Sequence, residues 1–270
     1  MEKMKKVWRR LCGLVSRISH YIFVCRCISC EQIIAEDEVL CEDCAAQFRA
    51  ALLSECGICG RSLSRCLCID RSLERSGIRR HIKLYRYITD DDEAVGNRIL
   101  YRIKRFDVRV AFRFLGSELA RCVRSLIAPT EKEYVVVFLP RTPKRVLHLG
   151  FDQSKNIASE MAEALQLPFC VALGRTRKAK TQKALHTTAE RRKNANGSFR
   201  LRKQAVAVAG KRVLLVDDIV TSGASMRAAA RLLRQAGARE VIAVSVAVVT
   251  RTRNLRAEAA KNSRLPFYMR

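Results

Sequence analysis

Two adjacent carboxylates, Asp217 and Asp218, follow an apolar run and stand shortly before a stretch of small residues. That stretch consists of Thr221, Ser222, Gly223, Ala224 and Ser225. Small side chains let backbone N–H groups approach a phosphate closely, and the dipole of a helix that begins there favours negative charge. Carboxylates would repel a phosphate, but they accept hydrogen bonds from sugar hydroxyls and they bind magnesium. The pattern favours a site for a phosphorylated sugar over the simpler alternative of a helix cap behind two surface acids.

A second chemistry-bearing group is the cysteines, nine of which lie between Cys25 and Cys68. Four of them form two C-x2-C pairs separated by ten residues, a spacing that suits tetrahedral zinc. These are Cys27, Cys30, Cys41 and Cys44. A less regular second set consists of Cys56, Cys59, Cys66 and Cys68. Disulfides are the alternative, but disulfide scaffolds normally accompany an export signal, which we do not expect in this sequence.

The expected role of zinc is structural. The segment from Cys25 to Arg75 has little apolar material to bury against itself, so metal binding would supply the missing folding energy. Four thiolates leave no open coordination position, which argues against a hydrolytic metal centre.

The charge of the chain points to phosphate-bearing partners. Lys and Arg number 52 against 26 Asp and Glu, giving a formal net charge of +26. Such a field favours nucleic acid, a phosphorylated small molecule or an anionic membrane surface, and the alternative is a basic but merely solvated surface.

No apolar run is long enough to span a bilayer, so we expect a soluble, cytoplasmic protein. Residues 1–24 read as a basic amphipathic helix without a signal-peptide cleavage site.

The elements that must position these residues are alternating strands and helices. Apolar runs predict strands at residues 81–88, 134–139, 213–216 and 241–249, and helical spacing predicts helices at 109–127, 154–165 and from 225 to Gly237. The acid pair then stands at the carboxyl end of the 213–216 strand, where open α/β sheets bind ligands. Residues after Pro140 and most of 174–200 read as basic surface loops.

The stretch VLLVDDIVTSGAS at 213–225 resembles the signature of type I phosphoribosyltransferases. Within that superfamily the chain resembles the ComF/GntX family, bacterial proteins with a cysteine-rich zinc module before a phosphoribosyltransferase domain, associated with DNA uptake in natural competence. Further matching segments follow in order. They are Leu139-Pro140, Pro143-Lys144-Arg145, Gly150-Phe151-Asp152-Gln153, Thr181-Gln182, Leu185, Glu190 to Asn194, and Phe199-Arg200. The chain has Asp152 and Ser222 where the family usually has Asn and Thr, and its last cysteine pair is C-x-C.

The resemblance implies a type I phosphoribosyltransferase-like parallel sheet flanked by helices, preceded by a small cysteine-rich zinc module. The implied boundaries are 1–24 for the basic segment, 25–75 for the zinc module, 76–252 for the phosphoribosyltransferase-like domain and 253–270 for a basic tail. Asp217 and Asp218 would bind the ribose hydroxyls, and residues 221–225 the 5′-phosphate. Magnesium would accompany phosphoribosyl pyrophosphate, and the loop at 178–200 would close over it. Arg141, Lys144 and Arg145 would face the pyrophosphate, with an exposed basic loop as their alternative.

Two functions from different classes remain. One is a competence protein that binds phosphoribosyl pyrophosphate and single-stranded DNA, with a competence helicase or recombination proteins as possible partners. The other is an active phosphoribosyltransferase with an unidentified acceptor. The spread of positive charge favours the DNA-related function, and the cluster Arg191, Arg192 and Lys193 is the candidate nucleic-acid contact. Catalytic residues are not identified, since phosphoribosyl transfer needs no enzyme nucleophile and the four histidines are isolated in sequence.

Overall fold

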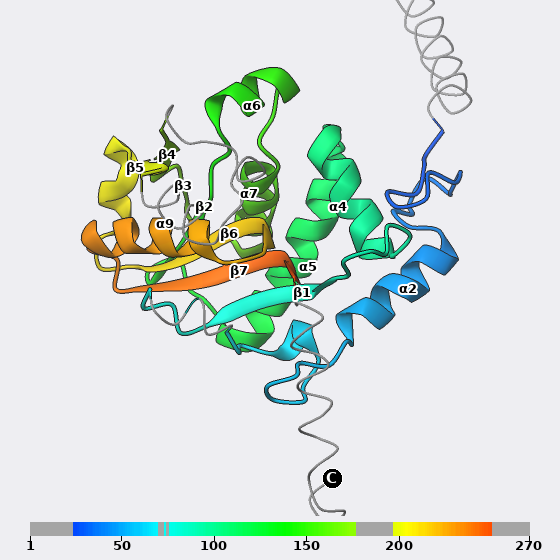
Figure 1. Cartoon of the computed structure of the whole chain (residues 1–270), viewed down its shortest axis with the longest axis horizontal. Coiled ribbons are helices and arrows are strands. Elements are labelled where there is room, and N and C mark those ends of the chain that lie inside the picture. Colours follow the sequence, from blue (N-terminus) through cyan, green and yellow to red (C-terminus); the bar gives the residue numbers. More distant parts are fainter. Residues whose placement is uncertain (1–23, 70–72, 74–75, 177–196, 250–270) are drawn as a thin grey trace, which may run out of the picture.

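The computed structural model describes residues 24–69, 73, 76–176 and 197–249 (Figure 1). Its centre is a parallel sheet of five described strands. Their order across the sheet is β1 (His81–Tyr87), β7 (Glu240–Val249), β6 (Arg212–Val220), β2 (Tyr134–Phe138) and β3 (Phe169–Cys170). Every neighbouring pair in this order is parallel, as the four predicted apolar runs require. The predicted α/β class is confirmed.

Helices cover both faces of the sheet because its strands are apolar on both sides. Along β6, Leu214 and Val216 pack with helices α5 (Arg109–Ile127) and α7 (Gln153–Leu165). Val213 and Leu215 point the other way and pack with helix α9 (Ala224–Gln235). The core therefore consists of two apolar layers with the sheet between them.

The two helices on the first face approach each other closely at Gly116. A Cβ atom there would lie 2.6 Å from Cβ of Glu160 and 2.9 Å from the backbone nitrogen of Met161. A glycine at this position of α5 therefore sets the distance to α7, whose first residues, Gln153 and Ser154, reach the acid pair.

The structure corrects two sequence-based expectations. The basic segment after Pro140 is not all loop, because residues Pro143–Leu149 form the short helix α6. Strand β6 does not end before the acid pair but continues through it to Val220. At the described ends of the 174–200 segment, β4 (Leu173–Arg175) pairs antiparallel with β5 (Phe199–Leu201), and residues 177–196 lie outside the described residues.

The cysteine-rich segment is built from short elements that pack on the sheet. Helix α2 (Glu42–Leu52) and the 3-10 turn η1 (Leu63–Arg65) are its regular parts. Helix α2 lies beside α4 (Val95–Arg105), and Phe48 of α2 contacts the rings of Tyr85 and Phe114 (Figure 1). A second 3-10 turn, η3 (Lys203–Val208), follows β5. Within the described residues, no helix combines the length and apolarity needed to cross a membrane.

Candidate ligand and metal sites

The acid pair is held in place by the first turn of α7. The side-chain amide of Gln153 donates to Oδ2 of Asp218 at 2.8 Å, and the hydroxyl of Ser154 donates to Oδ1 of Asp217 at 3.1 Å. Lys104 of α4 places its ammonium group 3.9 Å from Oδ2 of Asp218. Sequence reasoning predicted the acids but none of these three partners, which come from elements far away in the chain. The result is a fixed pair of carboxylates rather than two solvated surface acids.

The surroundings of Asp217 disfavour the ionised form of its carboxyl group. Desolvation, followed by the charge of Asp218, raises the pKa of Asp217 well above its ordinary value, although the Ser154 hydroxyl opposes the shift. An ionised carboxylate in this position gains from any ligand that donates hydrogen bonds or brings a cation. Sugar hydroxyls and magnesium are such ligands.

The small-residue loop turns the chain from β6 into α9. Gly223 is the N-cap of α9 and has φ 64°, a left-handed conformation that side chains with a Cβ rarely adopt. The Arg227 guanidinium donates to the carbonyl of Ser222 at 3.0 Å and so braces the loop. Thr221 is exposed, and Ser222 and Ser225 are partly exposed. The loop thus has the glycine turn and the helix N-terminus that the sequence pattern predicted.

Asp152, the residue that departs from the family pattern, has a structural role. It is the N-cap of α7: its Oδ1 accepts from the backbone N–H of Lys155 at 3.3 Å. Its Oδ2 accepts from the backbone N–H of Arg141 at 2.8 Å. An asparagine has a single side-chain acceptor oxygen, so the carboxylate ties two segments where an amide would need to share one atom. Desolvation raises the pKa of Asp152, and the two backbone donors act against that shift.

A cavity of about 860 Å³ lies between the β2–α6 loop, α6, α7 and the β4–β5 ribbon. Arg141 and Lys144, two of the predicted pyrophosphate residues, line this cavity. Arg145 is exposed and is not part of the lining. Four further cations line it that sequence reasoning did not assign: Lys155, Arg175, Arg200 and Arg202. The charges of Asp218 and Asp217 act on Arg141, so this lining residue of the cavity lies near the acid pair.

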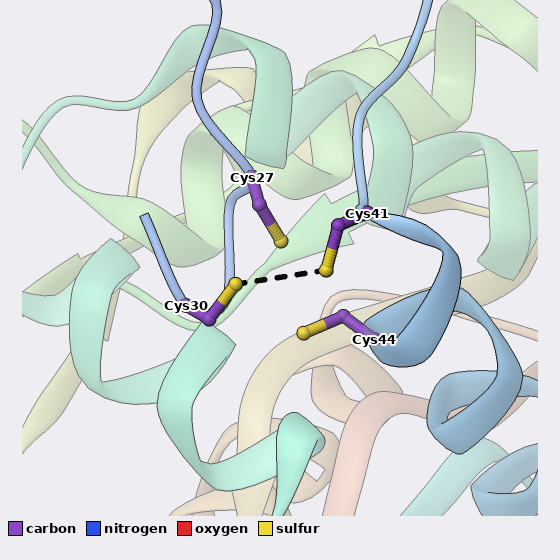
Figure 2. A group of neighbouring side chains, drawn as sticks. All are labelled: Cys27, Cys30, Cys41 and Cys44. Carbon is purple, nitrogen blue, oxygen red and sulfur yellow. Dashed lines mark hydrogen bonds between the residues drawn. The ribbon is translucent and has the colours of Figure 1, made fainter. Parts of the chain in front are cut away.

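The first cysteine cluster has the geometry of a four-thiolate metal site. The sulfur atoms of Cys27, Cys30, Cys41 and Cys44 all lie within 4.8 Å of one another (Figure 2). The Cys30 and Cys41 sulfurs are 3.6 Å apart. Four thiolates at a zinc–sulfur distance of about 2.3 Å would be separated by about 3.8 Å, so the cluster fits a tetrahedral ion. Cys41 precedes helix α2 and Cys44 lies in its first turn, so the second pair depends on a helix start.

The second cluster repeats this geometry despite its irregular spacing. The sulfur atoms of Cys56, Cys59, Cys66 and Cys68 also lie within 4.8 Å of one another. Those of Cys59 and Cys66 are 3.6 Å apart. The backbone N–H of Arg61 contributes most to lowering the pKa of Cys59 to about 7, which favours the thiolate form that binds metal. All eight cysteines are free of disulfides, as predicted.

Each cluster also receives a cation from the α/β core. Arg98 of α4 points Nη2 at the Cys44 sulfur, 3.6 Å away, and Lys83 of β1 places Nζ 3.4 Å from the Cys66 sulfur. Lys83 is buried and donates to the carbonyls of Cys68 and His81 as well. A divalent ion with four thiolates has a net charge of −2, which such cations offset. Neither cation was anticipated from the sequence, because each lies outside the cysteine spacing.

Other predicted features lie outside the described residues. These are residues 1–23 of the basic segment 1–24, the cluster Arg191, Arg192 and Lys193, the matching segments between 181 and 194, and the tail 253–270. Two of the four histidines, which are isolated in sequence, lie among the described residues. His81 is buried, with its Nε2 2.8 Å from the Ser245 hydroxyl oxygen, and His148 is exposed.

Comparisons with known proteins agree with this picture. Residues 153–265 match the phosphoribosyl transferase domain family. The chain is 26% identical to "Competence protein ComFC" of Bacillus subtilis over 221 residues, which cover 76% of this chain and 82% of the relative. It is 24% identical to "Competence protein F" of Haemophilus influenzae, over 80% of this chain and 93% of the relative. Among solved structures, the allosteric regulatory enzyme of purine biosynthesis matches 52% of this chain and 26% of its own length, with 25% identity and a TM-score of 0.35.

Proposed function

We propose that the chain is a member of the ComF/GntX family that binds phosphoribosyl pyrophosphate with magnesium, binds single-stranded DNA, and acts in DNA uptake. The observation that carries the sugar-phosphate part is the fixed acid pair beside a glycine-turned helix N-terminus. Asp217 and Asp218 would accept hydrogen bonds from the ribose hydroxyls. The backbone N–H groups of residues 221–225 would hold the 5′-phosphate, where the helix dipole favours it.

The pyrophosphate and its magnesium ion would lie between the acid pair and the cations of the cavity. Arg141 lies near the acids and lines the cavity, and Lys144 lines the same cavity. Magnesium would partly neutralise the pyrophosphate beside the two carboxylates. Zinc would fill the two thiolate clusters, and free thiols in such clusters suit the reducing cytoplasm.

The family's second activity, transfer to an acceptor, remains the other candidate. The cavity favours it, because a space of about 860 Å³ beside Arg141 leaves room for a second ligand next to the pyrophosphate.

A surface on α4 suits single-stranded DNA. Tyr101 is 53% exposed and Phe106 is 58% exposed, so each ring offers a face on which a base can stack. The Arg105 guanidinium lies 4.3 Å from the centroid of the Tyr101 ring and donates to its hydroxyl. Exposed Arg109 follows at the start of α5. Aromatic platforms between cations are the pattern that binds single strands with little dependence on sequence.

The sugar-phosphate assignment is tested with Asp217→Asn combined with Asp218→Asn. The ribose would lose the negative charge of its acceptors, so calorimetric titration with phosphoribosyl pyrophosphate and magnesium should show at least a hundredfold loss of affinity. Single-stranded DNA affinity should stay the same or rise slightly as two negative charges disappear. An unchanged titration with the sugar phosphate would remove the assignment. The exposed variant Asp37→Asn is the matched control and should titrate like the parent.

The DNA surface is tested by replacing its stacking ring and its cation. Tyr101→Ala should weaken binding of single-stranded DNA by about fivefold or more, because base stacking contributes about 1–3 kcal/mol. Arg105→Gln should also lower the slope of log affinity against log salt, by about 0.7 for each phosphate that the side chain no longer neutralises. Arg49→Gln removes one exposed positive charge from α2 and should change neither quantity. Equal effects of Arg105→Gln and Arg49→Gln would mean that DNA responds to the overall positive charge and has no defined binding surface at Tyr101 and Arg105.

A further inference from the structure

The cavity beside the sugar-phosphate site has an imbalance of charge. Its lining includes six cations and a single carboxylate, Asp152. That carboxylate is already occupied, since its two oxygens accept from the backbone N–H groups of Lys155 and Arg141. Among the described residues, none of the six cations takes part in an ion pair. The positive charge of this wall therefore exceeds the negative charge that the described residues place near it, which comes from Asp152, Asp217 and Asp218.

Two guanidinium nitrogens on this wall are buried without a partner in the described parts of the chain. They are Nη1 of Arg141 and Nε of Arg175. A buried donor without an acceptor costs free energy, so each of these nitrogens would gain from an acceptor atom of a bound ligand. Burial also lowers the pKa of Arg175, as expected for a charge withdrawn from water.

The β4–β5 ribbon presents further cations to the same space. Gly174 lies at the crossing of two side chains: a Cβ on it would be 3.2 Å from Nε of Arg202 and 3.5 Å from Nε of Arg200. The absent side chain lets both arginines lie across the ribbon. Arg175 is fixed by its neighbours, since its guanidinium lies 4.8 Å from the centroid of the Phe199 ring and donates to the carbonyl of Pro140.

Most of the remaining lining is apolar. Phe138, Val146, Val171 and Leu173 contribute to the cavity wall. A bare pyrophosphate has no apolar body to place against these side chains, so it does not account for the whole cavity. The complementary ligand has a ring or other apolar body and at least one anionic group.

We propose that this cavity binds a small organic anion, an apolar or flat molecule that carries a carboxylate, phosphate or sulfonate held by Arg175, Arg200 and Arg202. The ligand lies next to the pyrophosphate that the proposed function places at Arg141, and only the identity of that neighbour rests on the proposed function. The anionic group distinguishes this ligand from a neutral nucleobase.

The test uses two probes that differ in one anionic group, 8-anilinonaphthalene-1-sulfonate and N-phenyl-1-naphthylamine, titrated into the full-length protein. The sulfonate should bind at least tenfold more tightly than the uncharged probe. Arg200→Gln combined with Arg202→Gln should lower the affinity for the sulfonate at least tenfold and leave the affinity for the uncharged probe within about twofold. These two arginines are exposed, so the variant should fold like the parent. Arg49→Gln in α2 is the matched control and should bind both probes like the parent.

A similar affinity for both probes, or a sulfonate affinity that the double variant leaves unchanged, would overturn the proposal. Absence of binding by the sulfonate would overturn it as well. The proposed function is measured separately by the titration with phosphoribosyl pyrophosphate and magnesium. If that titration fails while the sulfonate result holds, the sugar-phosphate assignment falls and the anion site stands. The reverse outcome removes the anion site alone.

Discussion

Asp217 illustrates how a binding residue can oppose folding. Its carboxyl is desolvated beside a second acid, so the folded state holds the ionised form less well than water does. The folded-state pKa lies above the unfolded value. The resulting penalty is therefore fully present at pH values above the folded pKa. It decreases as the pH falls below that pKa and is gone below the unfolded pKa, where both states carry the proton.

Asp217→Asn should therefore stabilise the protein while removing sugar-phosphate binding. An amide keeps an acceptor oxygen for the Ser154 hydroxyl, and it has no charge to desolvate. We expect a rise in melting temperature of about 2–4 °C at pH 8, which corresponds to about 1 kcal/mol for a chain of this size. The gain should shrink at pH 5. Thermal unfolding at the two pH values measures this, with Asp37→Asn as the exposed control. A destabilised Asp217→Asn protein at pH 8 would contradict the argument.

For single residues, the sequence identified the site residues better than the side chains that hold them in place. Asp217, Asp218 and Gly223 were singled out because acids and small residues near a helix start have a clear chemistry. Gln153, Ser154 and Lys104 were not assigned as their partners, because only the folded chain brings α7 and α4 to the end of β6. The cavity cations Arg175, Arg200 and Arg202 were missed for the same reason.

Among the elements, long periodic segments were predicted well and short ones were not. Helix α5 was predicted with its bounds, and the buried strands were found from their apolar runs. Helix α6 has only seven residues, too few for a periodic pattern. Its ends nevertheless carried a usable signal, since Pro143 occupies the first turn and Gly150, at φ 79°, ends the helix.

Strand β6 was predicted too short because two acids are unfavourable strand residues in isolation. Pairing with β7 overrides that tendency: Asp217 pairs in register with Ser245, and the ladder continues to Val220 opposite Val248. The acids are consequently held by the pairing of β6 with β7 as well as by α7. A rigid strand is a better support for a binding pair than the loop that the sequence suggested.

At the scale of the whole molecule, the cysteine-rich segment shares its core with the α/β domain. Phe48, Tyr85 and Phe114 belong to one apolar cluster that also includes Cys27, Cys41 and Cys44. Arg98 and Lys83 connect the clusters to α4 and β1. Loss of metal should therefore also destabilise the part of the chain beyond residues 25–75.

Cys41→Ala is the test of that connection. The parent should contain about two zinc ions per chain, one for each cluster, and the variant should lose one. We expect a melting temperature lower by several degrees and a change in the near-ultraviolet signal of the aromatic cluster, because metal binding is coupled to folding. Cys122→Ala removes a buried thiol outside both clusters and should keep both ions. Metal loss with an unchanged melting temperature would show that the two parts fold independently.

The strand order has a consequence for how the chain is made. Strand β7 lies between β1 and β6, and it pairs His81 with Ala243 across most of the chain. On the ribosome, β1 emerges long before its only described partner strand, so its edge stays unpaired through most of synthesis. The cysteine segment emerges just before β1 and can bind metal and cover part of that strand early. The sheet is then completed in a single late step, and a polypeptide released before Glu240 would expose the hydrogen-bonding edges of two strands at once.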